Sequence, residues 1–327
     1  MDLRFVSLAE INLHDDGFEI RKFTEPARLR ESLERFGILD PPWLRKKGGR
    51  HIVVDGFKRL RWAEENGAQG TVCRIFPEDF DAGELWSLRI EKRLFEPEIN
   101  IAEKAQIIST LLGVFRPDQI PQSFLSALNV ANRPELLHKW ASLWAKGSET
   151  LEILASGAIA ERSAIEVADW DERSRIAVLA LIKALRCSAS IQIEIVERID
   201  EIAIRDEKAR AEIIETAGAR EILASKELNH RQKTQALREL LAELRYPRLS
   251  SRQERFRREI ESLGLPPRAR IIPPPAFEGN NWRIELSFTG AEELRKVLDS
   301  AGALVESNRL ETLLRPRLRR DKDEQNQ

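Results

Sequence analysis

The strongest constraint on the fold is a junction at residues 51–63, where a short apolar segment meets a cationic helix pattern. Residues 52–54 (Ile-Val-Val) have the composition of a buried β-strand, which Asp55 and Gly56 end. The helix pattern begins at once and carries three cations in its first turns: Lys58, Arg59 and Arg61. Because free N–H groups and the helix dipole attract anions, the junction predicts a phosphate-binding turn. The alternative is an ordinary strand-to-helix turn whose cations are solvated.

The residues around this junction have an α/β pattern. Leu29, Leu33 and Phe36 recur at helical spacing, and Gly37 ends that helix. Strands are predicted near residues 5–8, 41–45, 51–54 and 71–75, with a hairpin turn at 46–49. The rest of the chain is largely helical, so we predict a predominantly helical α+β protein.

Several motifs resemble, in the same order, those of the ParB partition proteins. Residues 55–61 (Asp-Gly-Phe-Lys-Arg-Leu-Arg) resemble the Gly-Glu-Arg-Arg-x-Arg motif of that family. Residues 29–41 resemble its first helix and the following turn, and residues 99–105 resemble the start of its central helical domain. The resemblance covers roughly residues 1–205 and lies in the collinear order of the motifs. It implies a ParB/sulfiredoxin-like domain followed by a ParB/KorB-like helix-turn-helix domain.

For residues 1–95 the resemblance implies a nucleotide-binding domain that takes CTP with magnesium. Glu91 is the implied metal ligand, because the family's Glu-Asn-x-x-Arg motif falls on residues 91–95, where Glu91 alone matches. Phe57 also replaces the family's glutamate. We therefore expect nucleotide binding with weak CTPase activity at most. The residues implied to bind the nucleotide are Arg21, Gly37, Ile38, Leu39, Gly56, Phe57, Lys58, Arg59, Arg61 and Glu91.

Residues 96–247 are predicted to form an all-α domain that contains the helix-turn-helix at 119–140. Ala127 is the small packing residue, Asn129 is a turn residue that tolerates a positive φ, and the second helix should begin near Asn132. Glu135 on that helix would repel phosphate. The residues expected to contact DNA are Gln122, Ser123, Asn132, Arg133, His138 and Lys139.

Residues 248–316 have the order helix, strand, strand, helix, which predicts a dimerisation module. A two-stranded hairpin with one apolar face is marginal alone, and pairing with a second copy would bury that face. We expect residues 317–327, basic and then of mixed charge, to be a disordered tail.

The charge balance restricts the expected partners. With 53 basic and 54 acidic side chains the net charge is -1, so DNA contacts must come from local clusters. The chain has no membrane-length apolar segment and no signal-peptide pattern, so a cytoplasmic, nucleoid-associated protein is expected. Cys73 and Cys187 have the pattern of buried free thiols. The resemblance also implies a homodimer and a ParA-like ATPase partner.

Two other functions stay open from the residues. One is a regulatory protein that keeps a ParB scaffold and interacts without nucleotide. The other is a small-molecule kinase that resembles free-serine kinases, with a catalytic glutamate among Glu25, Glu31 and Glu34 of the first helix. Sulfiredoxin chemistry is excluded, because it requires a cysteine where this chain has Phe57.

Overall fold

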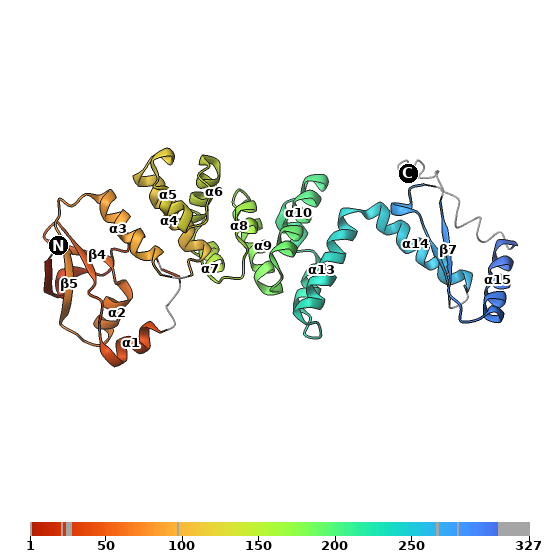
Figure 1. The fold of residues 1–327 in the computed structure, drawn as a ribbon, viewed down its shortest axis with the longest axis horizontal. Helices are drawn as coiled ribbons and strands as arrows, with labels where there is room; N and C mark the ends of the chain where they lie inside the picture. Colours follow the sequence, from red (N-terminus) through yellow and green to blue (C-terminus); the bar gives the residue numbers. More distant parts are fainter. Residues whose placement is uncertain are drawn as a thin grey trace, which may run out of the picture. The chain divides into compact units, whose positions relative to one another are not determined.

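Figure 1 shows the fold of the protein in a computed structural model. The structure describes residues 2–20, 22–23, 28–96, 98–265, 268–279 and 281–306, apart from the side chains of 301 and 304–306. It divides into two compact units, Met1–Arg238 and Glu239–Gln327. The prediction of a disordered tail at 317–327 lies outside the described residues.

The first unit begins with a five-stranded mixed sheet in the order β1-β5-β3-β4-β2. β3 and β4 form the predicted antiparallel hairpin, while β3 pairs with β5 and β2 pairs with β4 in parallel. The apolar segment 52–54 is buried within β4, as its composition predicted. The strands are β1 (Asp2–Ser7), β2 (Ile11–Asn12), β3 (Trp43–Lys47), β4 (Arg50–Asp55) and β5 (Gly70–Phe76).

Three helices accompany the sheet: α1 (Leu29–Phe36), α2 (Phe57–Glu65) and α3 (Ala82–Leu94). Leu60 of α2 and Leu85 of α3 are fully buried, which fixes these helices on the core. α1 forms where the apolar spacing predicted a helix, but its apolar residues are not equally buried. Leu33 is buried, but Phe36 is 60% exposed, with the Arg35 guanidinium 4.9 Å from its ring centroid.

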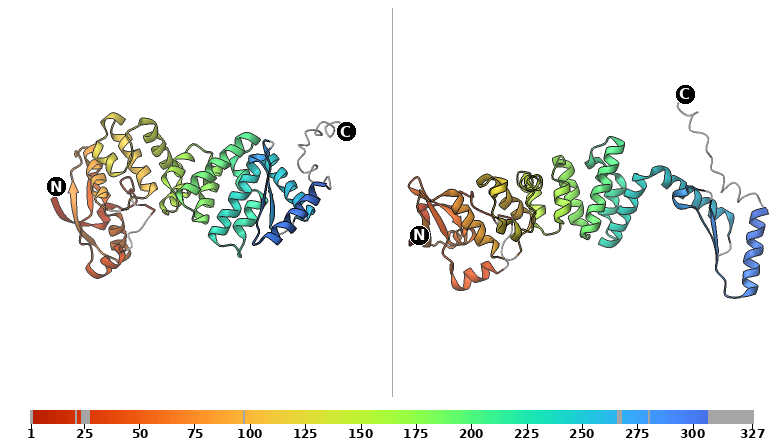
Figure 2. Two further views of the ribbon diagram at one scale, coloured as in Figure 1. Left: turned by 45° about the vertical axis from the view of Figure 1, so that its right-hand side comes forward. Right: turned by 45° about the horizontal axis from the view of Figure 1, so that its top comes forward.

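After α3, the helices of the first unit lie beside one another in the order of the chain (Figures 1 and 2). α4 (Ile101–Val114) is buried along most of its length and packs against α6 and α7. Asn129, between α5 and α6, has a φ of 52°, so the predicted positive φ is confirmed. The other helices are α5 (Gln122–Ala127), α6 (Pro134–Trp144), α7 (Ser148–Ala155), α8 (Glu161–Glu166), α9 (Glu172–Leu185), α10 (Ala189–Asp206), α11 (Arg210–Ile214) and α12 (Ala217–Ala224). α13 (His230–Arg245) begins in the first unit and ends in the second.

The second unit confirms the predicted order of helix, strand, strand, helix. Its elements are α14 (Pro247–Leu263), β6 (Ala269–Ile272), β7 (Arg283–Leu286) and α15 (Ala291–Glu306). Phe256, Phe277 and Trp282 form an aromatic cluster with ring centroids 5.4 to 6.2 Å apart. Ile271 of β6 pairs in register with Ile284 of β7 and is buried, whereas Ile284 is half-exposed.

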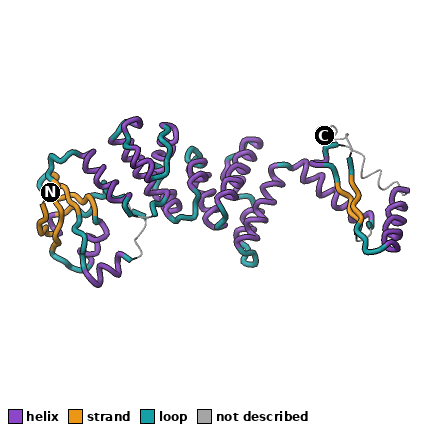
Figure 3. The backbone as a smooth tube through the Cα atoms, in the orientation of Figure 1, coloured by secondary structure: helices purple, strands orange, loops and turns teal. Residues whose placement is uncertain are grey.

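Helices predominate in both units and the strands are confined to two small sheets (Figure 3), so the predicted fold class is confirmed. Among the described residues, no helix is both long enough and apolar enough to span a membrane. Cys73 is buried and free, as predicted, and burial raises the pKa of its thiol to about 11. Cys187 is free but only partly buried, which differs from the prediction.

Candidate functional site

A cavity of about 370 Å³ lies where α1, α2 and α3 approach one another. This volume falls within the range of small-molecule sites, roughly 300 to 1,000 Å³. The described residues that line it include five cations and four carboxylates. They are Glu19, Arg28, Leu29, Ser32, Leu33, Gly37, Leu39, Asp40, Asp55, Gly56, Phe57, Lys58, Arg59, Arg89, Arg93 and Glu96.

The N-terminus of α2 forms one wall of the cavity. Gly56 is the N-cap residue, and its φ of 90° is a left-handed conformation that favours glycine. A Cβ added there would also lie 3.0 Å from the Pro42 Cβ. These two facts explain why this position holds a glycine. The first-turn N–H groups of α2 have no partner within the helix, so this wall attracts an anion.

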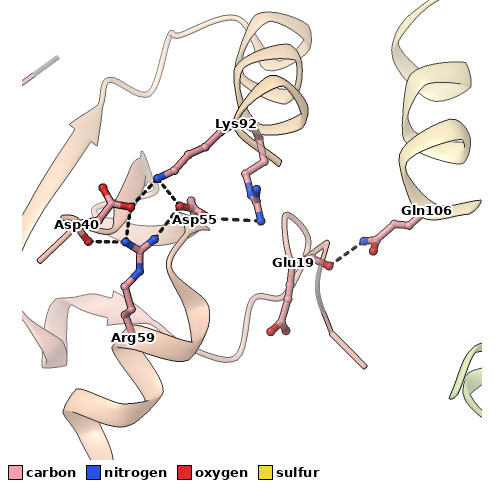
Figure 4. Close-up of polar contacts among 7 residues, drawn as sticks. Glu19, Asp40, Asp55, Arg59, Lys92 and Gln106 are labelled. Carbon is pink, nitrogen blue, oxygen red and sulfur yellow. Dashed lines mark hydrogen bonds and ion pairs between the residues drawn. The ribbon is translucent and has the colours of Figure 1, made fainter. Parts of the chain in front are cut away.

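A network of charges joins α2 and α3 beside the cavity (Figure 4). The Arg59 guanidinium binds the carboxylates of Asp40 and Asp55, and its Nη2 lies 2.8 Å from Asp55 Oδ2. Lys92 Nζ lies 2.8 Å from Oδ2 of both aspartates. Arg89 Nη2 lies 3.2 Å from the second oxygen of Asp55. Three cations therefore share two carboxylates.

This network keeps both carboxylates ionised. Burial acts to raise the pKa of Asp55, but Arg89, Arg59 and Lys92 outweigh it and lower the pKa to about 2. Burial also opposes ionisation of Asp40, yet hydrogen bonds from Lys92 and Arg59 lower its pKa. Both aspartates are anions at neutral pH and act as internal counterions of the cations.

Two arginines of α3 that line the cavity are buried. Arg93 lies 2.5 Å from Glu103 of α4, and its Nη atoms also donate to the backbone oxygens of Glu96 and Glu98. Arg89 is buried beside Asp55, and burial lowers its pKa. No described residue accepts a hydrogen bond from Nε of Arg89 or of Arg93. Each arginine thus retains donor capacity at a site where a buried polar group normally has a partner.

Arg61, which the sequence assigned to the nucleotide, has a different position. Its guanidinium forms two 2.7 Å hydrogen bonds with the carboxylate of the buried Glu19. Gln106 of α4 donates to the Glu19 backbone oxygen at 2.8 Å. Arg61 does not line the large cavity; it lines a neighbouring pocket of about 240 Å³ that Lys58 also borders. Glu19 therefore links Arg61 of α2 to Gln106 of α4.

The structure brings six of the ten predicted nucleotide residues to the cavity wall. They are Gly37, Leu39, Gly56, Phe57, Lys58 and Arg59. Ile38, Arg61 and Glu91 do not line it, and Arg21 lies outside the described residues. Sequence reasoning missed Arg28, Asp40, Arg89 and Arg93. The spacing of Arg89, Lys92 and Arg93 was a usable signal, because positions i, i+3 and i+4 share one face of a helix.

The residues around the cavity do not fit the expected magnesium ion. Glu91 is exposed on α3 and does not line the cavity. The described residues contain no group of three or more His, Cys, Asp or Glu side chains placed to hold a metal. Asp40 and Asp55 supply the oxygen ligands that magnesium prefers, but three cations already bind them.

The two described glutamates of the kinase alternative are not at the cavity either. Glu31 and Glu34 are exposed on α1 and do not line it. Glu34 lies 3.4 Å from Arg30 in an exposed ion pair. Glu25 lies outside the described residues.

The six predicted DNA-contacting residues form an exposed surface around α5 and α6. Gln122 and Ser123 lie in the first turn of α5, Asn132 and Arg133 precede α6, and His138 and Lys139 lie on α6. α6 begins at Pro134, two residues later than predicted. Lys139 Nζ lies 3.4 Å from Asp169, while the described residues offer no ion pair to Arg133.

Comparison with solved structures found 15 similar chains, among them three ParB structures. A scan of protein-family models and a search of curated proteins found no match. The C-terminally truncated chromosome-partitioning protein ParB from Caulobacter crescentus, complexed to the centromeric parS site, is 16% identical with a TM-score of 0.32. The same protein complexed with CTP-gamma-S is 17% identical with a TM-score of 0.25. A Pnob8-like ParB-N domain is 17% identical with a TM-score of 0.33.

These matches cover 60%, 56% and 74% of this chain, respectively, and 99% of each solved chain. All three solved chains are ParB structures, and ParB is the family that the sequence motifs of this chain resemble.

Proposed function

We propose that this chain is a ParB-like DNA-binding protein of the chromosome or plasmid partition type, whose cavity binds a CTP-type nucleotide. The observation that carries the proposal is the N-terminus of α2, which opens on the cavity between Lys58, Arg59 and Arg89. A triphosphate is a polyanion, and free helix N–H groups with nearby guanidinium and ammonium groups suit its oxygens.

Hydrolysis is not part of the proposed function beyond a weak CTPase activity. Phe57, at the start of α2, has an apolar ring and is buried, so it supplies no group that would move a proton. Glu91 is exposed on α3 and the cavity carboxylates are engaged by cations. We assign no step to magnesium, since the donor set of the cavity does not fit it.

DNA binding is assigned to the α5–α6 surface, and homodimerisation to the second unit. Arg133 supplies the cation for DNA phosphates at the start of α6, and Gln122, Asn132 and His138 supply neutral hydrogen-bonding groups. In the second unit, Ile284, Phe288 and Leu298 are each about half exposed and provide an apolar surface. A ParA-like ATPase partner and a cytoplasmic, nucleoid-associated location belong to the same proposal.

Calorimetric titration with CTP, ATP and GTP, with and without duplex DNA, tests the nucleotide site. We expect Lys58→Met to weaken CTP binding by about tenfold, because one charge-assisted contact to a phosphate contributes roughly 1.5 to 3 kcal/mol before solvent screening. Lys47→Met is the matched control, because Lys47 is exposed on the β3–β4 hairpin and does not line the cavity. Absence of binding by all three nucleotides would remove the nucleotide from the proposal.

A second candidate is a regulatory protein on the same scaffold that acts without nucleotide. It is favoured by the pairing of cavity cations within the protein: Arg59 with Asp40 and Asp55, and Arg93 with Glu103. With these cations paired inside the protein, the fold around the cavity does not need a bound ligand to balance their charge. This candidate predicts the same dimer mass in light scattering with and without CTP, whereas a dimer that forms only with CTP contradicts it.

A further inference from the structure

Asp40 differs from the other carboxylates of the charge network. It follows the turn at Gly37–Leu39, and its side chain is 56% exposed. Asp55 ends β4, is 11% exposed, and contacts Arg59, Lys92 and Arg89. Asp40 shares Arg59 and Lys92 with Asp55 and has no contact with Arg89. Asp55 is thus a fixed part of the core, and Asp40 is the more weakly held of the two anions.

Asp40 is placed where its carboxylate competes with any anionic ligand of the cavity. Asp40 lines the cavity and binds Arg59 through its carboxylate and its backbone oxygen. Arg59 lies in the first turn of α2, where a bound phosphate would meet the free N–H groups. A phosphate that approaches this turn therefore competes with the Asp40 carboxylate for the guanidinium of Arg59.

Lys92 is a second cationic partner of Asp40, and a ligand in the cavity would not contact it. Its Nζ lies 2.8 Å from Asp40 Oδ2 and 4.5 Å from the centroid of the Trp43 ring, and Lys92 does not line the cavity. Asp40 can release Arg59 and remain paired with Lys92. Exchange of one partner costs less than complete loss of pairing, because no charge is left alone.

We propose that Asp40 is a displaceable internal anion: it binds Arg59 in competition with the phosphate of a ligand and so limits the affinity of the cavity. This inference rests on the proposed nucleotide-binding function and adds the residue that sets its strength. Because the competitor is a carboxylate of the protein and the cavity binds with its own cations, the competition operates without a divalent metal.

Calorimetric titration of inorganic triphosphate in the presence of EDTA tests the proposal on the full chain. Asp40→Asn keeps the shape of the side chain and removes its charge. We expect it to bind triphosphate at least about tenfold more tightly than the wild type, since removal of a like charge near the ligand lowers repulsion. Asp79→Asn is the matched control: Asp79 is exposed in the same unit, does not line the cavity, and should leave the affinity unchanged.

Asp40→Ala provides a second variant and should show the same gain, because the effect comes from the charge. If the wild type binds triphosphate and both Asp40 variants bind it equally or more weakly, the internal competition is wrong while the phosphate site stands. If neither the wild type nor the Asp40 variants bind triphosphate or CTP, the proposed nucleotide site itself is wrong. A gain in Asp79→Asn as large as in Asp40→Asn would also contradict the proposal, because overall charge would then explain it.

Discussion

The cavity beside α2 and the α5–α6 surface both contain cations assigned to phosphate, but they hold them differently. At the cavity Arg89 and Arg93 are buried, and Arg59, Arg89 and Arg93 each bind a carboxylate. On the α5–α6 surface Arg133 and His138 are exposed, and Lys139 has an exposed contact of 3.4 Å with Asp169. The first arrangement is part of the core, whereas the second lies on top of a core made by other residues.

A mutation is therefore expected to act differently in the two regions. A buried charge that loses its partner is expensive, about 3 to 5 kcal/mol, whereas exposed ion pairs contribute about 0 to 1 kcal/mol. Changes at the cavity should therefore alter both folding and binding. Changes on the α5–α6 surface should alter binding alone, which makes the comparison testable.

The largest effect is expected from Arg93→Met. Arg93 and Glu103 are 1% and 4% exposed, so the variant removes a buried ion pair together with the hydrogen bonds from Arg93 to the backbone oxygens of Glu96 and Glu98. We expect the free energy of unfolding in urea to fall by about 3 to 5 kcal/mol. Arg30→Met removes an arginine from an ion pair that is exposed on both sides and should leave the urea midpoint unchanged.

The double variant Arg93→Met, Glu103→Gln sharpens this prediction. It removes both charges, so part of the lost stability should return. Equal destabilisation by the single and double variants would show that Arg93 stabilises the fold through packing. Ion pairs at the cavity would then contribute as little to stability as those on the α5–α6 surface.

The sequence predicted the α/β elements and the start of α2 because they depend on local signals. Residues 52–54 are apolar and Gly56 must have a positive φ, so both can be recognised from neighbours in the chain. Asn129 was predicted on the same basis, and its φ is positive. The six residues expected to contact DNA were chosen from the order of the two helices along the chain, and their role remains a prediction.

The charge network was not predictable in the same way. Asp40 meets Lys92 across 52 positions, and Arg61 meets Glu19 across 42. Such pairs depend on how α1, α2 and α3 approach one another. The family motif also drew attention to Glu91, whereas its neighbours Arg89 and Arg93 are the residues that line the cavity. Helical spacing identifies a shared face, but tertiary packing decides which face points inward.

The second prediction concerns the pH dependence of stability. The cations hold the pKa of Asp55 at about 2, below its ordinary value of 3.8. A lowered folded-state pKa gives stability that is present above pH 4 and is lost as the pH falls towards 2. The shift corresponds to about 2 kcal/mol, because one pKa unit is about 1.4 kcal/mol.

Urea unfolding of the wild type and Asp55→Asn at pH 6, 4, 3 and 2 measures this contribution. The stability difference between the two proteins should shrink by about 2 kcal/mol between pH 6 and pH 2, since protonation removes the charge from the wild type as well. A difference that stays constant over this range would show that the charge of Asp55 does not stabilise the fold.

The smallest effect is expected on the α5–α6 surface. Arg133→Ala should weaken binding to duplex DNA by about threefold to tenfold and lower the slope of log K against log salt by about 0.9, as expected for one lost phosphate contact. Lys139→Ala should have a smaller effect, because Asp169 already lies 3.4 Å from its ammonium group. The urea midpoint should not change in either variant, in contrast to Arg93→Met.

Fluorescence anisotropy at several salt concentrations gives the affinities, with Arg173→Ala on α9 as an exposed control. If Arg173→Ala reduces the slope as much as Arg133→Ala does, DNA binding is a diffuse property of the surface and the start of α6 has no special role.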